Sequence, residues 1–108
     1  MLLVRAFRVH PDKINLLLGW GRELQRRRDE VMETFTNETV RHGLAFLLQS
    51  IEGPVLVHSM EAADLDKASR AVEEHPLPID LEHRAVMREA LAGRIDLEIV
   101  YDISVSGA

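Results

Sequence analysis

The order in which strand-like and helix-like patterns follow one another constrains the fold of this chain more than any other feature. Residues 2–9 are mostly apolar, "LAFLLQSI" (residues 44–51) and "VLVHSM" (residues 55–60) flank the turn signal "EGP", and "RIDLEIVYDI" (residues 94–103) alternates between apolar and polar residues. Such runs are typical of strands. One helical pattern separates the first two strands, and two helical patterns separate the last two. This order predicts an α+β protein with the ferredoxin-like split βαβ arrangement β-α-β-β-α-α-β: a four-stranded antiparallel sheet of order 4-1-3-2 with helices on one face.

The first helical pattern is predicted to run from Pro11 to about Phe35. Residues at steps of three and four form a single seam along one face of this helix. All of them are apolar except Arg28: Leu17, Trp20, Leu24, Arg28, Val31 and Phe35. Arg28 can extend its charge to the edge of the sheet, pair with a buried carboxylate, or bind an anionic ligand. The sequence favours the first two.

The stretch "EHPLPIDLEHR" (residues 74–84) ends the second helix, predicted over "EAADLDKASRAVEEH", and starts a third that runs from about Ile79 to residue 92. Pro78 suits the first turn of that helix, and Asp80 follows where the helix dipole favours a carboxylate. Gly93 lies where a glycine that terminates a helix belongs.

His83 shares the apolar face of the third helix with Ile79, Val86 and Ala90. It is either a core histidine that hydrogen bonds to a backbone carbonyl or a carboxylate, or a general acid/base that faces a pocket. We favour the core role, because the helix faces the sheet. That role predicts an almost fully enclosed ring.

The composition limits the class of protein. A net charge of -5 argues against general nucleic-acid binding, and the absence of cysteine fits a reducing compartment. No apolar run approaches the ~20 residues of a membrane span, and Arg5 and Arg8 interrupt the apolar N-terminus before a signal-peptide core could form. We therefore predict one cytoplasmic domain over residues 1–108, without nucleic-acid or membrane partners.

The strands are too apolar for the sheet face away from the helices to meet only water. A second subunit that covers this face is the simplest solution, so the sequence predicts a homodimer.

The segments "ELQRRRDE" (residues 23–30), "EAADLDKA" (residues 61–68) and "EHPLPIDLEHR" resemble an uncharacterised bacterial family of short ferredoxin-like proteins. The layout as a whole resembles the dimeric α/β-barrel superfamily, in which two sheets pack face to face around a central cavity. This resemblance implies a fold and a dimer. It implies no particular activity, because the superfamily includes both enzymes and binding modules.

Polar residues on the predicted strands supply the candidate ligand-binding site. Arg5 or Arg8, His58, and Glu98 with Asp102 are expected to be neighbours on the face away from the helices, among apolar side chains. They form either a ligand cavity or charge pairs at the dimer interface. His83 and His58 are the candidate catalytic residues.

We predict no cofactor and no metal site. His75, Asp80 and His83 lack a standard ligand spacing, and there is no cysteine to complete a site. Two hypotheses therefore remain. The protein is a homodimer that binds a small organic molecule between its sheets, with or without transforming it, or it is a non-catalytic association domain with a filled barrel.

Overall fold

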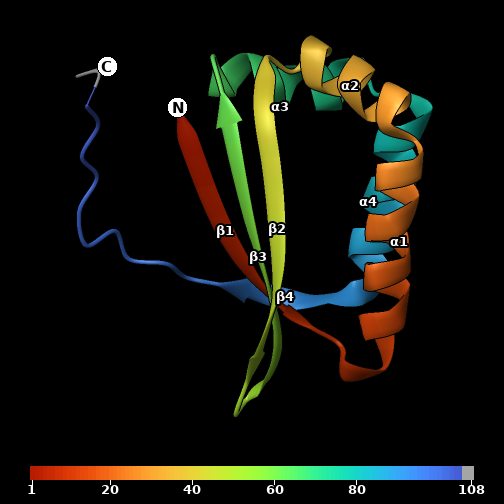
Figure 1. Ribbon diagram of the computed structural model, residues 1–108, viewed down its shortest axis with the longest axis vertical. Coiled ribbons are helices and arrows are strands. Elements are labelled where there is room, and N and C mark those ends of the chain that lie inside the picture. Colours follow the sequence, from red (N-terminus) through yellow and green to blue (C-terminus); the bar gives the residue numbers. More distant parts are fainter. Residues whose placement is uncertain (106–108) are drawn as a thin grey trace.

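The computed structural model describes residues 1–105 and contains four strands and four α-helices (Figure 1). In chain order the elements are β1 (Leu2–Val9), a short 3-10 helix η1 (Pro11–Lys13), α1 (Ile14–Arg26), α2 (Arg28–Asn37), β2 (Val40–Ser50), β3 (Gly53–Ala62), α3 (Leu65–Glu74), α4 (Pro78–Ala90) and β4 (Leu91–Ile95).

The four strands form one antiparallel sheet of order β2-β3-β1-β4. This is the predicted order, with the first strand between the third and the fourth, and the split βαβ arrangement is confirmed. Within residues 1–105, no helix has the length and apolar character needed to cross a membrane.

The predicted first helix is two helices. Arg27, with φ -99° and ψ 41°, interrupts the helix between α1 and α2, and the two run in different directions (Figure 1). Neither proline nor glycine occurs at the break, so the local sequence carries no signal for it. The prediction of one continuous helix is wrong, and so is the single seam that depended on it.

The hairpin is confirmed, but it is longer than the two apolar runs. β2 begins at Val40, so it also includes residues 40–43, which precede the predicted apolar run at residues 44–51. Gly43 faces α2, where a Cβ atom would lie only 2.9 Å from the Phe35 ring. A glycine at this position lets the sheet and α2 approach each other closely.

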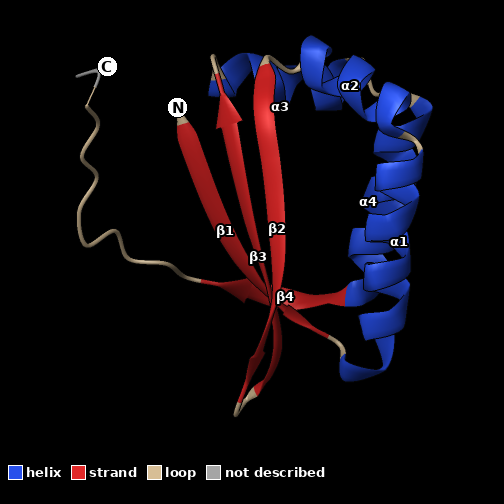
Figure 2. Ribbon diagram, viewed as in Figure 1, coloured by secondary structure: helices blue, strands red, loops and turns tan. Residues whose placement is uncertain are grey.

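The last strand differs most from the prediction. α4 ends at Ala90, β4 follows at once as Leu91–Ile95, and residues 96–105 leave the sheet without regular structure (Figure 2). Gly93 does not terminate the helix. It lies inside β4 at a φ of 140°, a backbone conformation that favours glycine, near the register shift between β1 and β4.

The start of α4 follows the sequence prediction. Pro78 is its first residue, and the Asp80 side chain accepts a hydrogen bond from the Leu77 backbone N–H at 2.8 Å. Leu77 has no side-chain oxygen with which to cap the helix, so Asp80 supplies the polar contact at this end.

The core lies between the sheet and the pair α1 and α4. Val9, Leu17, Leu56 and Ala90 form its buried centre, and partly buried apolar side chains surround them. The four come from β1, α1, β3 and α4, so this cluster joins both layers of the fold.

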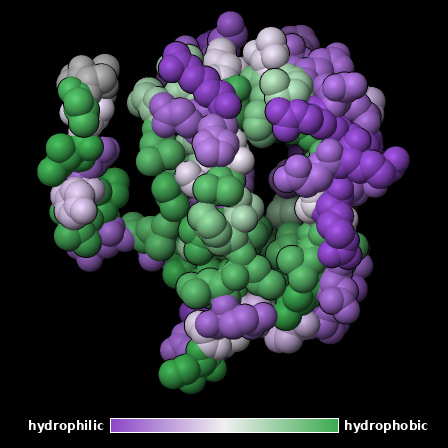
Figure 3. Space-filling view, viewed as in Figure 1, coloured by the Kyte–Doolittle hydropathy of each residue, from purple (hydrophilic) through white to green (hydrophobic). Residues whose placement is uncertain are grey.

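The opposite face of the sheet is apolar and open. It carries five large apolar side chains that are 42–64% exposed: Leu2, Val4, Leu44, Phe46 and Leu48. In Figure 3, hydrophobic side chains gather over the strands, whereas hydrophilic side chains cover the outer helices. An apolar face of this kind is typical of a surface that binds a partner.

Candidate functional site

Arg5 and His58 are neighbours on the face of the sheet that the helices cover. Leu56 packs against Leu17 of α1, so Leu56 points toward the helices. His58 lies two residues further along β3 and therefore points the same way. Arg5 of β1 is directly opposite His58 in the register and shares its face. The expected proximity of the two residues is confirmed, but their expected position on the far face is wrong.

His83 of α4 meets Trp20 of α1 across the helix pair. The indole Nε1–H of buried Trp20 donates a hydrogen bond to Nδ1 of His83 at 2.8 Å. Because Nδ1 accepts, the neutral ring carries its proton on Nε2. The predicted partner, a carbonyl or a carboxylate, is wrong. The ring is also not enclosed as predicted, because His83 is solvent-exposed.

Both histidines are held in the uncharged form near neutral pH. Burial lowers the pKa of His58, and the nearby Arg5 guanidinium lowers it further. Burial among neighbouring atoms also lowers the pKa of His83, as does His58, while Asp80 opposes the shift. The ring of His83 is therefore partly desolvated, although the residue as a whole is exposed. Uptake of a proton by His83 at Nδ1 requires the loss of the hydrogen bond from Trp20.

Arg5 has no carboxylate partner within ion-pair distance in the part of the chain that the structure describes. Its side chain is exposed, beside His58 and on the same side of the sheet as His83. The helix-covered face therefore brings together an unpaired guanidinium and two neutral imidazoles.

The arginine that packs against Trp20 is Arg27, whereas the sequence predicted that Arg28 would occupy the seam. The guanidinium carbon of Arg27 lies 6.0 Å from the centroid of the Trp20 ring, within the range of a cation–π contact. Arg27 also binds Glu82 of α4 at 2.6 Å and Glu30 of α2 at 2.7 Å. Its side chain is only 17% exposed, whereas Arg28 is exposed. The break at Arg27 changes which arginine faces inward.

The other predicted ligand-binding residues lie elsewhere. Arg8 is three positions from Arg5, so it points to the open face of the sheet, where it pairs with Glu52 at 3.7 Å. Glu98 and Asp102 belong to the segment beyond β4 and are exposed. The expected group of Arg8, His58, Glu98 and Asp102 does not form within one chain, because its members occupy both faces of the sheet and the segment beyond it.

Asp80 also binds Thr34 of α2, whose hydroxyl donates to the carboxylate at 2.6 Å. Asp80 thus accepts hydrogen bonds from both Thr34 and the Leu77 backbone, and so connects the start of α4 to α2. Among residues 1–105 no three histidine, cysteine or acidic side chains are arranged to hold a metal ion.

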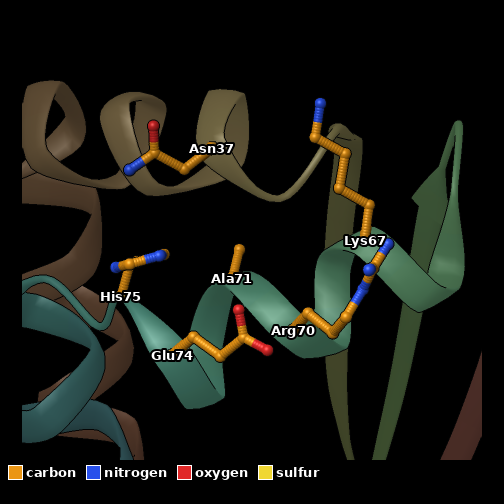
Figure 4. Close-up of a pocket in the computed structure, with 6 residues that line it drawn as sticks. All are labelled: Asn37, Lys67, Arg70, Ala71, Glu74 and His75. Carbon is orange, nitrogen blue, oxygen red and sulfur yellow. The ribbon is translucent and has the colours of Figure 1, made fainter.

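A surface groove with a volume of about 500 Å³ lies between α2 and α3 (Figure 4). Six residues line it: Asn37, Lys67, Arg70, Ala71, Glu74 and His75. Figure 4 shows Lys67 and Arg70 at one end and His75 at the other. Ligand pockets are lined mainly by apolar side chains, whereas five of the six side chains that line this open groove are polar or charged. The group of Arg5 and His58, with His83 on the same side of the sheet, is the better candidate because it combines an unpaired guanidinium with two imidazoles whose pKa is lowered.

The sequence contained part of the signal for the Trp20–His83 pair. A buried indole N–H needs an acceptor, and a histidine on an apolar helix face needs a partner. Both residues were expected on helix faces that point to the same sheet. No comparable signal identified Arg27, because its role depends on the helix break.

The hydrogen bond between Trp20 and His83 predicts a pH-dependent fluorescence signal. Trp20 is the single tryptophan of the chain, so its emission reports on this site alone. Protonation of His83 places a hydrogen on Nδ1 and removes the acceptor. We expect the emission to change with a midpoint below 6.5, the ordinary histidine pKa, because the pKa of His83 is lowered.

Stability should follow the same titration. In the unfolded chain His83 takes up a proton near pH 6.5, whereas the folded protein resists it, so acidification favours unfolding. The free energy of unfolding should be greatest above pH 6.5 and fall as the pH drops toward the lower native pKa. His83→Gln, which can still accept from the indole, should remove the emission change. A midpoint at or above 6.5, or an unchanged curve in the variant, would contradict this prediction.

Comparison with known proteins gives a family and no activity. The model of the "Family of unknown function (DUF6176)" matches residues 2–105. No curated protein and no solved structure matches the chain. The predicted membership of an uncharacterised family is confirmed, whereas the match does not bear on the wider superfamily. Because the match covers nearly the whole sequence, the chain belongs to the family of unknown function DUF6176.

Proposed function

We propose that the protein is a homodimer that binds a small organic anion at Arg5, His58 and His83. The observation that carries this proposal is the unpaired, exposed Arg5 guanidinium beside the uncharged His58 imidazole, with the uncharged His83 imidazole next to His58. The sequence placed the ligand between the sheets of two subunits. The orientation of Arg5 and His58 favours the helix side of each sheet instead.

The chemistry of these side chains favours a carboxylate. A guanidinium presents parallel N–H donors that match the two oxygens of a carboxylate. The histidines can add a hydrogen bond in their neutral form and a positive charge after protonation. If the bound molecule is transformed, His58 and His83 are the groups that can exchange a proton with it.

The open sheet face supports the dimer. Its five large, exposed apolar side chains would bury their surface against the same face of a second copy, and a two-fold axis makes such a contact self-complementary. The proposal includes the cytoplasm as the compartment, since a chain without cysteine suits a reducing environment.

The same open face also favours a second candidate function, association without a ligand. An apolar surface that is filled by its partner needs no bound molecule. The two candidates differ in what they predict for Arg5, because association through the open face does not involve a side chain on the helix side.

Titration with benzoate tests the proposal. Benzoate carries a carboxylate for Arg5, and benzamide has nearly the same shape without the charge. We expect benzoate to change the emission of Trp20 in a saturable manner, with an affinity at least about tenfold higher than that of benzamide, as a charge-assisted hydrogen bond provides. The affinity should rise as the pH falls, because protonated histidines add positive charge.

Arg5→Gln and Arg8→Gln form a matched pair of variants. They make the same change on the same strand, but only Arg5 lies on the helix side of the sheet, beside His58. Benzoate binding should weaken by about tenfold or more in Arg5→Gln and stay unchanged in Arg8→Gln. Equal affinities in the two variants, or no saturable signal in the unmodified protein, would refute the anion site and leave association as the function.

A further inference from the structure

Residues 96–105, which we name the C-terminal arm, have the pattern of a strand but lie outside the sheet. Alternate side chains are large, apolar and 51–108% exposed: Leu97, Ile99, Tyr101, Ile103 and Val105. The arm leads away from the body of the protein (Figures 1 and 2). An alternating segment normally buries its apolar side against another surface. Among residues 1–105 no strand of the sheet pairs with residues 96–103, so this segment has the sequence of a strand without its neighbouring strand.

The outer edge of β2 is suited to receive such a strand. β2 has eleven residues and lies at the edge of the sheet, so one side of its backbone faces no neighbouring strand. Exposed edges of long strands readily pair with an added strand. The arm has a closely matching length of ten residues.

Charge also favours this pairing. The arm contains three carboxylates, Asp96, Glu98 and Asp102, and no basic residue. β2 contains Arg41 and His42 and no carboxylate. Opposite charges on neighbouring strands stabilise a pairing, whereas two arms placed side by side would repel each other.

The topology explains why the arm does not reach the β2 edge of its own chain. The arm leaves from β4, and β4 and β2 form the two opposite edges of the sheet. A second copy related by a two-fold axis can present its β2 edge to the arm and receive the same contact in return.

We propose that the C-terminal arm of each chain adds as a fifth strand to the β2 edge of a second copy of the protein. The apolar side of the arm, which includes Leu97, Ile99 and Tyr101, extends the apolar open face of the partner sheet. The inference rests on the dimer of the proposed function, and it adds the element that each subunit contributes to its partner.

Two neighbouring residues of the arm provide the test. Ile99 and Val100 are both β-branched and are 77% and 91% exposed, but they point to opposite sides of an extended arm. We expect Ile99→Asp to raise the dimer dissociation constant, measured by sedimentation equilibrium, by about tenfold or more. Val100→Asp, on the side that already carries the carboxylates, should change it less than about threefold.

Hydrogen exchange of the backbone then identifies the acceptor edge. In the unmodified dimer, the β2 amides that do not bond to β3 should exchange slowly. They should exchange faster in Ile99→Asp and in a chain that ends at Ile95. Circular dichroism and Trp20 emission establish that the variants remain folded.

The outcomes separate this inference from the dimer itself. If the dimer is equally stable in Ile99→Asp and in the shortened chain, the arm does not pair with the partner, but the dimer itself stands. Fast hydrogen exchange of the β2 edge amides in the unmodified dimer would lead to the same conclusion. An unmodified protein that is monomeric at micromolar concentration would overturn both.

Discussion

Replacing Phe46 with aspartate is expected to raise the dissociation constant of the proposed dimer by about a hundredfold or more, because a buried charge without a partner costs several kcal/mol. Phe46 lies in the middle of β2 and is 54% exposed on the open face of the sheet. In the dimer this side chain would be enclosed by the partner, and a carboxylate there would lose its water. Light scattering should give twice the chain mass of 12.3 kDa for the unmodified protein and the single mass for the variant.

Leu81→Asp is the matched control for Phe46→Asp. Leu81 is 51% exposed, close to the value for Phe46, but it lies on α4 and not on the open face of the sheet. The control should leave the dimer unchanged. Equal effects of the two substitutions, or a dimer that survives Phe46→Asp, would show that the open face is not the interface.

Leu17→Ala is expected to lower the free energy of unfolding by about 2–4 kcal/mol, the range for removing a buried leucine side chain from a core. Leu17 is 7% exposed and packs with Val9, Leu56 and Ala90, so the change leaves a cavity at the junction of both layers. A loss of this size is a large part of the roughly 5–15 kcal/mol that stabilises a domain. Urea unfolding at one fixed protein concentration measures the change, since dimerisation adds to the apparent stability.

Leu18→Ala provides the reference for Leu17→Ala. It makes the same substitution at the next position of α1, where the side chain is 43% exposed. Its cost should stay below about 1 kcal/mol, because an exposed site leaves no cavity. Similar losses at Leu17 and Leu18 would mean that the core does not lie between α1 and the sheet.

The features that sequence reasoning predicted correctly depend on local patterns. The order of the strands follows from the order of apolar runs and helices, since few topologies accommodate β-α-β-β-α-α-β. The start of α4 follows from Pro78 and Asp80, whose effects act within one helical turn.

The position of the site could not be predicted because the strand sequences do not show which side chains point to which face of the sheet. β3 reads Val55, Leu56, Val57 in succession, so its apolar residues are compatible with either orientation. A shift of one residue turns every side chain of a strand to the other face. Packing of Leu56 against α1 selects the orientation, and with it the side to which His58 and Arg5 point.

The helix break at Arg27 has a similar origin. The sequence around it suits a continuous helix, and nothing local separates Arg27 from Arg28. Arg27 contacts Trp20, two turns earlier on α1, and Glu82 of α4, which is distant in the sequence. The contact with Glu82 exists only after α4 has packed beside α1.

The sequence by itself determined the order of the strands and helical regions, the sheet topology, the cap of α4 and the apolar character of both sheet faces, because periodicity and capping act over a few residues. The tertiary structure alone decided that Arg5, His58 and His83 share the helix side, that His83 accepts from Trp20, and that residues 96–105 leave the sheet. These features depend on register and on contacts between distant segments. A local sequence pattern specifies neither the register nor these contacts, because the free energy that selects both comes from packing the helices against the sheet.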